Sequence, residues 1–370
     1  MVPALAGYTA RNSVVLVAFE GKLTCGAFRV DLPDRDRTAD HRACISGVLA
    51  IVTRLRRATG VIPVIYTERS FEGSQGIPHL EFGRALMKRL HDSGFSVRDA
   101  FCVAADGWAS YLDPDYPREG HPLAEIETSP AGPSARAAFG RPIGDVSEIG
   151  TLPDPDPALA DQLNFVLDTL EDAGVPRMLG RLSDLHPLGW AELCAVRKLD
   201  ELPPEAWAWL IHLAQTPANR DLLMLQFAFG QATAEVVAEE NARYLEIQRA
   251  TGQTMDEVVI AEIDAGRSNL HSETADLLMG QSERRPDIER VKAAIDVLSV
   301  LIANVREHYR VPLLCMLAWL SWSLGRGSAA GSFVDMALEL EPDYSMAQLL
   351  HTLFAGGRIP EWAFSETDAT

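Results

Sequence analysis

Residues 13–32, SVVLVAFEGKLTCGAFRVDL, decide the fold class of the first part of this chain. Residues 13–20 form a run rich in β-branched side chains, Gly21 and Lys22 interrupt it, and residues 23–32 continue as a second extended run. Two such runs around a glycine-containing break predict a β-hairpin. We therefore expect the chain to open with a pair of antiparallel strands.

The residues that follow the hairpin alternate between helix and strand patterns. Apolar residues at helical spacing end before Gly60, and VIPVIYTE then reads as a strand whose Pro63 indicates an edge or a bulge. The order β-β-α-β-α-β-β predicts an α/β domain with a mixed sheet over residues 1–112. Its expected elements after the hairpin are a helix over 38–58, a strand over 61–68, a helix over 78–93, and strands over 95–103 and 108–112.

Residues 113–157 contain nine of the 22 prolines of the chain. Proline lacks a backbone donor and disfavours both helix and sheet, so we interpret this stretch as an extended connection between domains. The alternative is a long excursion lying across the first domain. Residues 158–370 show helical periodicity almost throughout and predict an all-α domain, in which the charged stretch 231–310 is a possible projecting helical insertion.

The sequence near the C-terminus predicts a helical hairpin similar to a single tetratricopeptide unit. Gly325 would end the first helix, Phe333 and Ala337 lie in the second, and Pro342 ends the hairpin. A single unit of this kind cannot bury its own apolar face, so we expect it to dock on the preceding helices. A peptide-binding groove is the alternative interpretation.

Five stretches carry a family resemblance in combination: VPALAGYTARNSVVLVAFEG, AFRVDLPD, VIYTE, DGWASYLDPDYPREGHPL and AWLSWSLGRGSAAGSFVDMALELEPDYSMAQLL. Together they resemble the mainly actinobacterial family called domain of unknown function 4192 (DUF4192), over residues 1–175 and 311–356. The resemblance implies an intracellular bacterial protein with the α/β-then-α order, and it supplies no activity. Many relatives have cysteines where this chain has Asp113 and Tyr116, so it implies no thiol or metal role there.

The formal net charge of −19 limits the classes of partner. Residues 1–100 contain 14 basic and 10 acidic residues, a balance of +4, which leaves −23 on the other 270 residues. Nucleic-acid binding depends on cations that meet phosphates, so an acidic body excludes nucleic acids and anionic membrane surfaces as expected partners. No apolar run is long enough to span a bilayer and no secretory signal is visible, so we expect a cytoplasmic protein.

Carboxylates after the predicted strands are the weak candidates for catalysis. Asp31, Glu68 and Asp106 follow the second, third and fourth strands. Strand ends of an α/β sheet favour ligands, and converging carboxylates could hold Mg²⁺ for a hydrolytic or phosphoryl-transfer reaction. The competing interpretation, that these residues cap helices or solvate loops, is the one we favour. We therefore predict no cofactor and no confident metal site.

Trp108, Ser110 and Tyr111 form the most distinctive short motif, and they are weak candidates for ligand binding. They could line the pocket of a small-molecule sensor, or pin the adjacent Pro-rich segment to the sheet, which we favour. The sequence lacks a G-x-S-x-G elbow, a Walker loop and a Rossmann fingerprint. We therefore expect a protein more likely to bind than to catalyse, with a protein partner or another copy of itself as the ligand.

Overall fold

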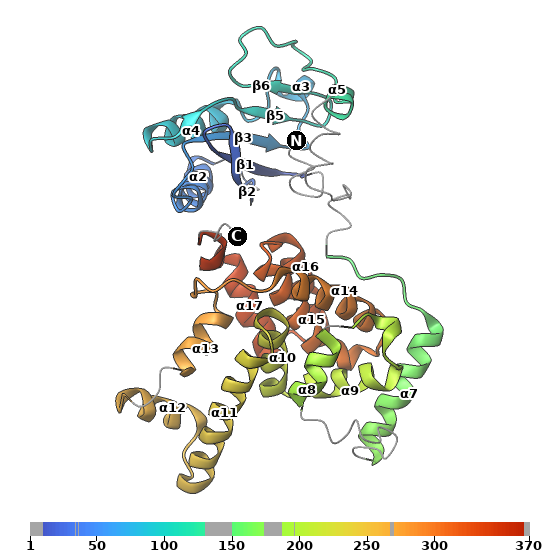
Figure 1. Cartoon of the computed structure of the whole chain (residues 1–370). Coiled ribbons are helices and arrows are strands. Elements are labelled where there is room, and N and C mark those ends of the chain that lie inside the picture. The colour runs from blue at the N-terminus through green and yellow to red at the C-terminus, as the bar shows by residue number, and fades with distance from the viewer. Residues whose placement is uncertain are drawn as a thin grey trace. The chain divides into compact units, whose positions relative to one another are not determined.

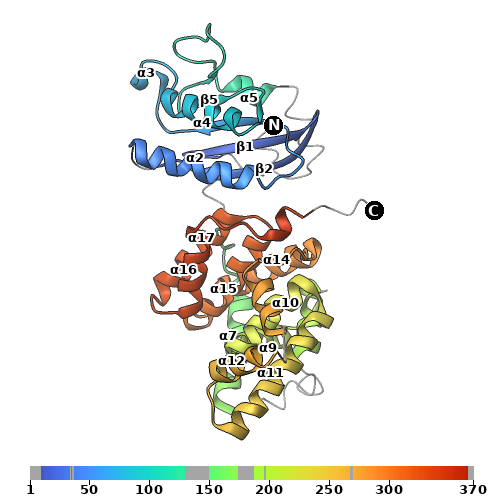
Figure 2. The ribbon, with the colours of Figure 1, turned by 90° about the vertical axis from the view of Figure 1, so that its left-hand side faces the viewer.

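The computed structural model of the chain describes residues 10–33, 35, 37–129, 150–173, 187–195, 197–266 and 270–365. The chain divides into two compact units, Met1–Ile149 and Gly150–Thr370. A β-sheet with helices forms the first unit, and packed helices form the second (Figure 1, Figure 2). The predicted fold class is thus confirmed. Residues 130–149, which belong to the predicted connection, lie outside the described residues.

The first unit contains a six-stranded mixed sheet in the order β2-β1-β3-β5-β6, with β4 beside β3. β1 runs antiparallel to β2 and β3, whereas β3 runs parallel to β4 and β5, and β6 returns antiparallel to β5. The elements are β1 (Ser13–Glu20), β2 (Leu23–Asp31), α2 (Thr38–Val52), β3 (Gly60–Tyr66), α3 (Phe71–Ser74), α4 (Leu80–Asp92), β4 (Ser96–Val97), β5 (Phe101–Val103), β6 (Trp108–Ser110) and α5 (Ala124–Thr128).

Pro63 accounts for the split of the expected strand 95–103 into β4 and β5. The N–H of Arg98 donates to the carbonyl of Val61 at 3.0 Å. The next bond of a regular parallel ladder would need the N–H of residue 63, which proline lacks. The register then shifts by one residue, from Gly60 opposite Ser96 to Val64 opposite Phe101. The irregularity expected at Pro63 is therefore present, but the expected edge position is wrong because β3 lies in the middle of the sheet.

The two long helices of the first unit cover the same face of its sheet. Val14, Leu16 and Ile65 pack there with the apolar sides of α2 and α4, whereas Val15 and Val64 belong to a separate cluster on the opposite face. The crossovers through α2 and α4 therefore lie on one side. In doubly wound sheets a ligand crevice forms where successive crossovers change sides. The described part of this unit contains no such change.

Residues 113–129 pack on the first unit, which differs from the extended connection expected from residue 113 onward. The N–H of Trp108 donates to the carbonyl of His121 at 2.9 Å, and the N–H of His121 donates back at 2.7 Å. The Tyr116 and Phe71 rings lie 6.4 Å apart. This segment follows the alternative of an excursion across the first domain, because its backbone satisfies donors and acceptors at the outer edge of β6.

The second unit is helical, and the structure contains no strand after residue 110 in the described ranges. Pro312 lies inside a helix that begins at Glu307. The helices are α7 (Pro157–Ala173), α8 (Pro187–Ala195), α9 (Pro204–Ala214), α10 (Pro217–Phe229), α11 (Gln231–Thr251), α12 (Met255–Asp264), α13 (Leu270–Leu278), α14 (Ile288–Asn304), α15 (Glu307–Ser323), α16 (Gly327–Leu340) and α17 (Ser345–Ala355), with short 3₁₀ turns at Leu199–Glu201 and Glu361–Ala363.

The core of the helical unit is centred on α15. Trp319 is fully buried in one large cluster that also contains Phe333 of α16 and Leu350 of α17. The C-terminal hairpin is therefore docked on the preceding helices, as expected from its apolar face. Buried Arg220 of α10 donates to the Tyr344 hydroxyl at 2.8 Å and adds a polar contact to this docking. The tetratricopeptide likeness of the hairpin stays a prediction.

Candidate functional site

The strands β2, β3 and β5 all end on the same side of the sheet. This side, formed by strand ends and not by an outermost strand, is called here the carboxyl edge. β2 and β3 are both antiparallel to β1 and therefore run in the same direction, and β5 is parallel to β3. Ser13 is in register with Asp31 on one side and with Tyr66 on the other. The strands that lead to the candidate carboxylates Asp31, Glu68 and Asp106 therefore all end at the carboxyl edge.

The three carboxylates do not converge at that edge. Asp31 pairs with Arg29 at 2.5 Å and its side chain is 76% exposed. Glu68 is exposed, and Asp106 accepts the N–H of Phe71 at 2.9 Å, so it caps the short helix α3. Among the described residues no three His, Cys, Asp or Glu side chains are grouped so that they could hold a metal ion. The Mg²⁺ cluster that was the less favoured alternative is therefore not formed by these described residues, because each carboxylate has a separate local environment.

The Trp108–Tyr111 motif makes structural contacts. The Trp108 ring stacks on His121 with centroids 4.7 Å apart. Ser110 Oγ donates to Asp99 at 2.5 Å, and the Tyr111 hydroxyl donates to the carbonyl of Pro78 at 2.8 Å. Burial raises the pKa of Tyr111 well above its ordinary value. These contacts fix the loop before α4 and the segment after β6 against the sheet.

One row of side chains at the carboxyl edge was missed by the sequence analysis. Ser13, Tyr66, Val103, Trp108 and His121 are in register across four strands and the adjoining bridge, so they share the face opposite the helices. Ser13 is fully buried, and its Oγ and the Trp108 Nε1 have no hydrogen-bond partner among the described residues. Period-two alternation in the sequence places Ser13 on the same side of β1 as Val15, and Tyr66 on the same side of β3 as Val64. That Ser13 lies opposite Tyr66 could be known only from the pairing of β1 with β3.

A hydroxyl–imidazole pair lies after the central strand. Thr67 Oγ1 and His79 Nε2 are 3.1 Å apart, and Thr67 Oγ1 also accepts the N–H of Arg69 at 3.2 Å. His79 and Asn12 have left-handed backbones, with φ of 56° and 37°. Asn12 accepts the N–H of Glu68 through its side chain. Such strained residues require support from their surroundings, and here they fix the ends of β1 and β3. No sequence motif predicted this contact.

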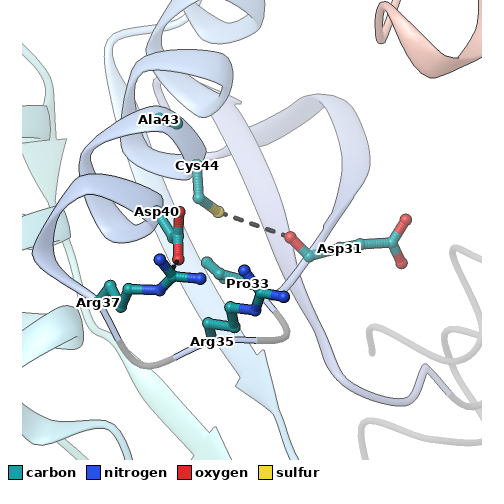
Figure 3. Close-up of a pocket in the computed structure, with 7 residues that line it drawn as sticks. All are labelled: Asp31, Pro33, Arg35, Arg37, Asp40, Ala43 and Cys44. Carbon is teal, nitrogen blue, oxygen red and sulfur yellow. Dashed lines mark hydrogen bonds and ion pairs between the residues drawn. The ribbon is translucent and has the colours of Figure 1, made fainter.

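A shallow hollow of about 480 Å³ opens beside the N-terminus of α2 (Figure 3). Arg37 pairs with Asp40 at 3.4 Å, and Arg35 lies beside Pro33. The Asp31 side chain points away from the hollow, while its carbonyl accepts the Cys44 thiol at 3.6 Å. Burial, followed by the Asp31 charge, raises the pKa of Cys44 to about 11. The thiol is therefore protonated at neutral pH and a poor nucleophile.

The fold and site define a two-unit protein in which a mixed sheet with helices on one face precedes a helical unit, and no group of three His, Cys, Asp or Glu side chains in the described residues could hold a metal ion. The chain belongs to the DUF4192 family (domain of unknown function), whose model matches residues 1–243 and 284–361. No curated protein and no solved structure matches the chain. The family resemblance inferred from the motifs is thus confirmed.

The unmatched residues 244–283 fall inside the stretch 231–310 that was expected to be an addition. They contain the end of α11, all of α12 and α13, and part of the loop that follows. Tyr244, Val258 and Val259 form a small buried cluster of their own between α11 and α12. Arg243 pairs with Glu262 at 2.6 Å beside it. The distal part of this segment therefore has a local core, separate from the large cluster of the helical unit.

The charge of the chain follows the division into units. Met1–Ile149 contain 17 basic and 18 acidic residues, a balance of −1, which leaves 16 basic and 34 acidic residues, a balance of −18, in Gly150–Thr370. The +4 region of the sequence analysis thus belongs to a unit that is nearly neutral as a whole. No helix of the described ranges has the length and hydropathy needed to cross a bilayer.

Proposed function

We propose that this protein acts by binding a protein partner that offers a basic surface to its helical unit. The observation that carries the proposal is the confinement of 18 excess negative charges to one unit. A surface of one sign raises the rate of encounter with an oppositely charged protein and disfavours wrong partners. This proposal retains the expectation from sequence that the protein binds a protein partner, and it specifies that the partner is basic.

Exposed apolar side chains on the same unit support the proposal. Phe165 is 65% exposed, Leu349 67% and Ile260 58%. Ile260 of α12 has exposed Glu257 and Asp264 one helical turn away on either side. Interfaces combine apolar anchors with a charged rim that sets specificity, and these residues supply both kinds of group.

The test compares two charge-reversal variants of equal net charge. The first changes three exposed residues of α11 in the helical unit, and the second changes three exposed residues of the sheet unit. They are Glu235→Lys, Glu239→Lys and Glu246→Lys, matched by Glu72→Lys, Glu81→Lys and Glu119→Lys. Each tagged full-length variant is used to capture proteins from the native host, and the captured proteins are identified by mass spectrometry.

We expect the wild-type chain to capture a basic protein in a manner that weakens as salt is added. The α11 variant should lose this partner and the sheet-unit variant should keep it. Capture that is insensitive to salt, or equally reduced by both variants, would contradict the proposal. Recovery of no specific protein would contradict it as well.

A further inference from the structure

The segment 244–283 carries more than its share of the charge of the helical unit. It contains 8 acidic and 2 basic residues, a balance of −6. This is one third of the −18 of Gly150–Thr370, in 40 of its 221 residues. The family model does not match this segment. A segment outside the common core can carry a surface particular to one chain, because packing of that core does not constrain its sequence.

Within this segment, α12 is held in one orientation on α11. Val258 and Val259 are buried in a cluster with Tyr244. Glu262 is buried and pairs with Arg243 at 2.6 Å. Rotation of α12 would separate this buried carboxylate from its arginine, which is strongly unfavourable. The opposite side of α12 is therefore fixed toward solvent, and Figure 1 shows α11 and α12 extending away from α15, the centre of the helical unit.

The solvent side of α12 presents four exposed residues, called here the outer stripe. They recur at the spacing i, i+3, i+4 and i+7, which places them on one face of a helix. They are Glu257, Ile260, Ala261 and Asp264. Ile260 is 58% exposed at the centre of the stripe. The two carboxylates are seven residues apart, about 10 Å along the helix, so the outer stripe has an apolar centre between two negative charges.

Asp264 lies where a carboxylate does not stabilise α12. It is the last residue of the helix, where a negative charge opposes the negative end of the helix dipole. Glu257 differs, because its carboxylate accepts the N–H of Thr254 at 2.9 Å and caps the start of the helix. Residues that break a local preference commonly serve a function. Helix stability thus accounts for the position of Glu257 but not for that of Asp264.

We propose that the outer stripe is the docking surface for the basic partner, and that the partner meets it with an amphipathic helix. This helix carries basic residues seven positions apart, each opposite a carboxylate, and apolar residues between them that cover Ile260. Ala261 has a small side chain, so the second helix can approach closely. This proposal rests on the proposed function and adds to it where the partner binds and what it presents.

Charge selects a basic partner over the other possible occupants of the outer stripe. A second copy would bring two segments of −6 together, and these repel one another. The sheet unit, with a balance of −1, offers no excess of positive charge. A surface of two helical turns is small for a stable interface. Complementary charge must therefore supply part of the affinity, which makes binding sensitive to salt.

The first experiment measures the binding of a defined probe to the full-length chain by fluorescence anisotropy. The probe is a fluorescein-labelled peptide of about 18 residues, long enough for a helix, with lysines seven positions apart, leucines between them and alanine elsewhere. The control peptide has the same composition in scrambled order. We expect tighter, salt-sensitive binding of the patterned peptide. Equal binding of the two peptides would overturn the proposal, because it would mean that only net charge is recognised.

Matched variants locate the binding on α12. Ile260→Ser removes the apolar centre and should weaken binding of the patterned peptide about tenfold. Leu349→Ser, at a 67% exposed position of α17, should leave it unchanged. Asp264→Asn should weaken it about threefold without lowering the melting temperature, and Asp335→Asn, at an exposed position of α16, should have no effect. Wild-type affinity in Ile260→Ser, or an equal loss in Leu349→Ser, would overturn the proposal.

Sedimentation and capture from the native host separate the remaining outcomes. A wild-type dimer that Ile260→Ser dissociates in analytical ultracentrifugation would overturn the proposal in favour of a second copy. We expect the basic protein that the α11 charge-reversal variant fails to capture to be lost by Ile260→Ser as well. Retention of that protein by Ile260→Ser would overturn the docking surface and leave the proposed function standing. Capture of no specific protein would contradict the proposed function, and the peptide measurements would still decide whether the outer stripe binds a basic helix.

Discussion

Replacing Gly280 by alanine should destabilise the helical unit by about 2–5 kcal/mol, the sum of a backbone and a packing contribution. Gly280 follows α13 with φ of +67°, in the left-handed region. An L-residue there costs about 1–2 kcal/mol relative to glycine. Gly325, which ends α15 with φ of +75°, offers the matched control.

The packing contribution distinguishes the two glycines. A Cβ at Gly280 would overlap the Trp322 ring and lie 3.2 Å from the Cα of Pro360. Trp322 is buried, and its indole N–H donates to the carbonyl of Arg358 at 2.8 Å, so the ring cannot move away freely. Overpacking of this kind costs about 1–3 kcal/mol. At Gly325 nothing lies within 4 Å of the added Cβ, so only the backbone cost applies.

Tryptophan fluorescence during urea denaturation measures this difference. Six of the seven tryptophans lie in Gly150–Thr370, so the signal reports mainly on the helical unit. We expect Gly280→Ala to lower the free energy of unfolding by about 1–3 kcal/mol more than Gly325→Ala does. Equal destabilisation by the two substitutions would refute the argument, because it would mean that the close approach of Trp322 and Pro360 imposes no cost.

Three further predictions concern individual side chains. Tyr344→Phe leaves a buried Arg220 donor without its acceptor and should cost about 1.5–3 kcal/mol in urea denaturation. Arg290 donates to the Glu192 carboxylate and lowers its pKa in the folded protein. The stabilisation from this carboxylate is therefore present above its unfolded pKa of about 4.3, and it is lost as the pH falls through the lower folded pKa. Glu192→Gln should therefore flatten the acid side of the stability curve, and an unchanged curve would contradict this. Burial raises the pKa of both thiols, that of Cys44 to about 11, but Cys25 is the less buried of the two. We therefore expect iodoacetamide to modify Cys25 before Cys44, as measured by peptide mass spectrometry.

Local patterns predicted most of the order of the elements, although the expected strand 95–103 is split into β4 and β5. The hairpin expected over residues 13–32 is β1 and β2, since period-two alternation and a short break act within a few residues of each other. The apolar face of the C-terminal hairpin predicted its docking on other helices, because burial of that face is required wherever it lies. Pro63 predicted an irregularity, but its position within the sheet depended on which strands became its neighbours.

The roles of the candidate residues were decided by contacts between distant parts of the chain. Asp31, Glu68 and Asp106 follow strands that do share an edge, yet the first pairs with Arg29 and the last caps α3. Sequence shows which residue types follow a strand, but not where their side chains point. That direction is set by the partners each side chain meets.

By itself, the sequence determined a mixed sheet, then a helical unit, and an uneven distribution of charge, because periodicity and composition act over short distances. Only the tertiary structure decided the register that aligns Ser13 with Tyr66 and the near neutrality of the first unit. These properties depend on which strands pair and where one compact unit ends, and strand pairing is a long-range choice that local preference does not encode.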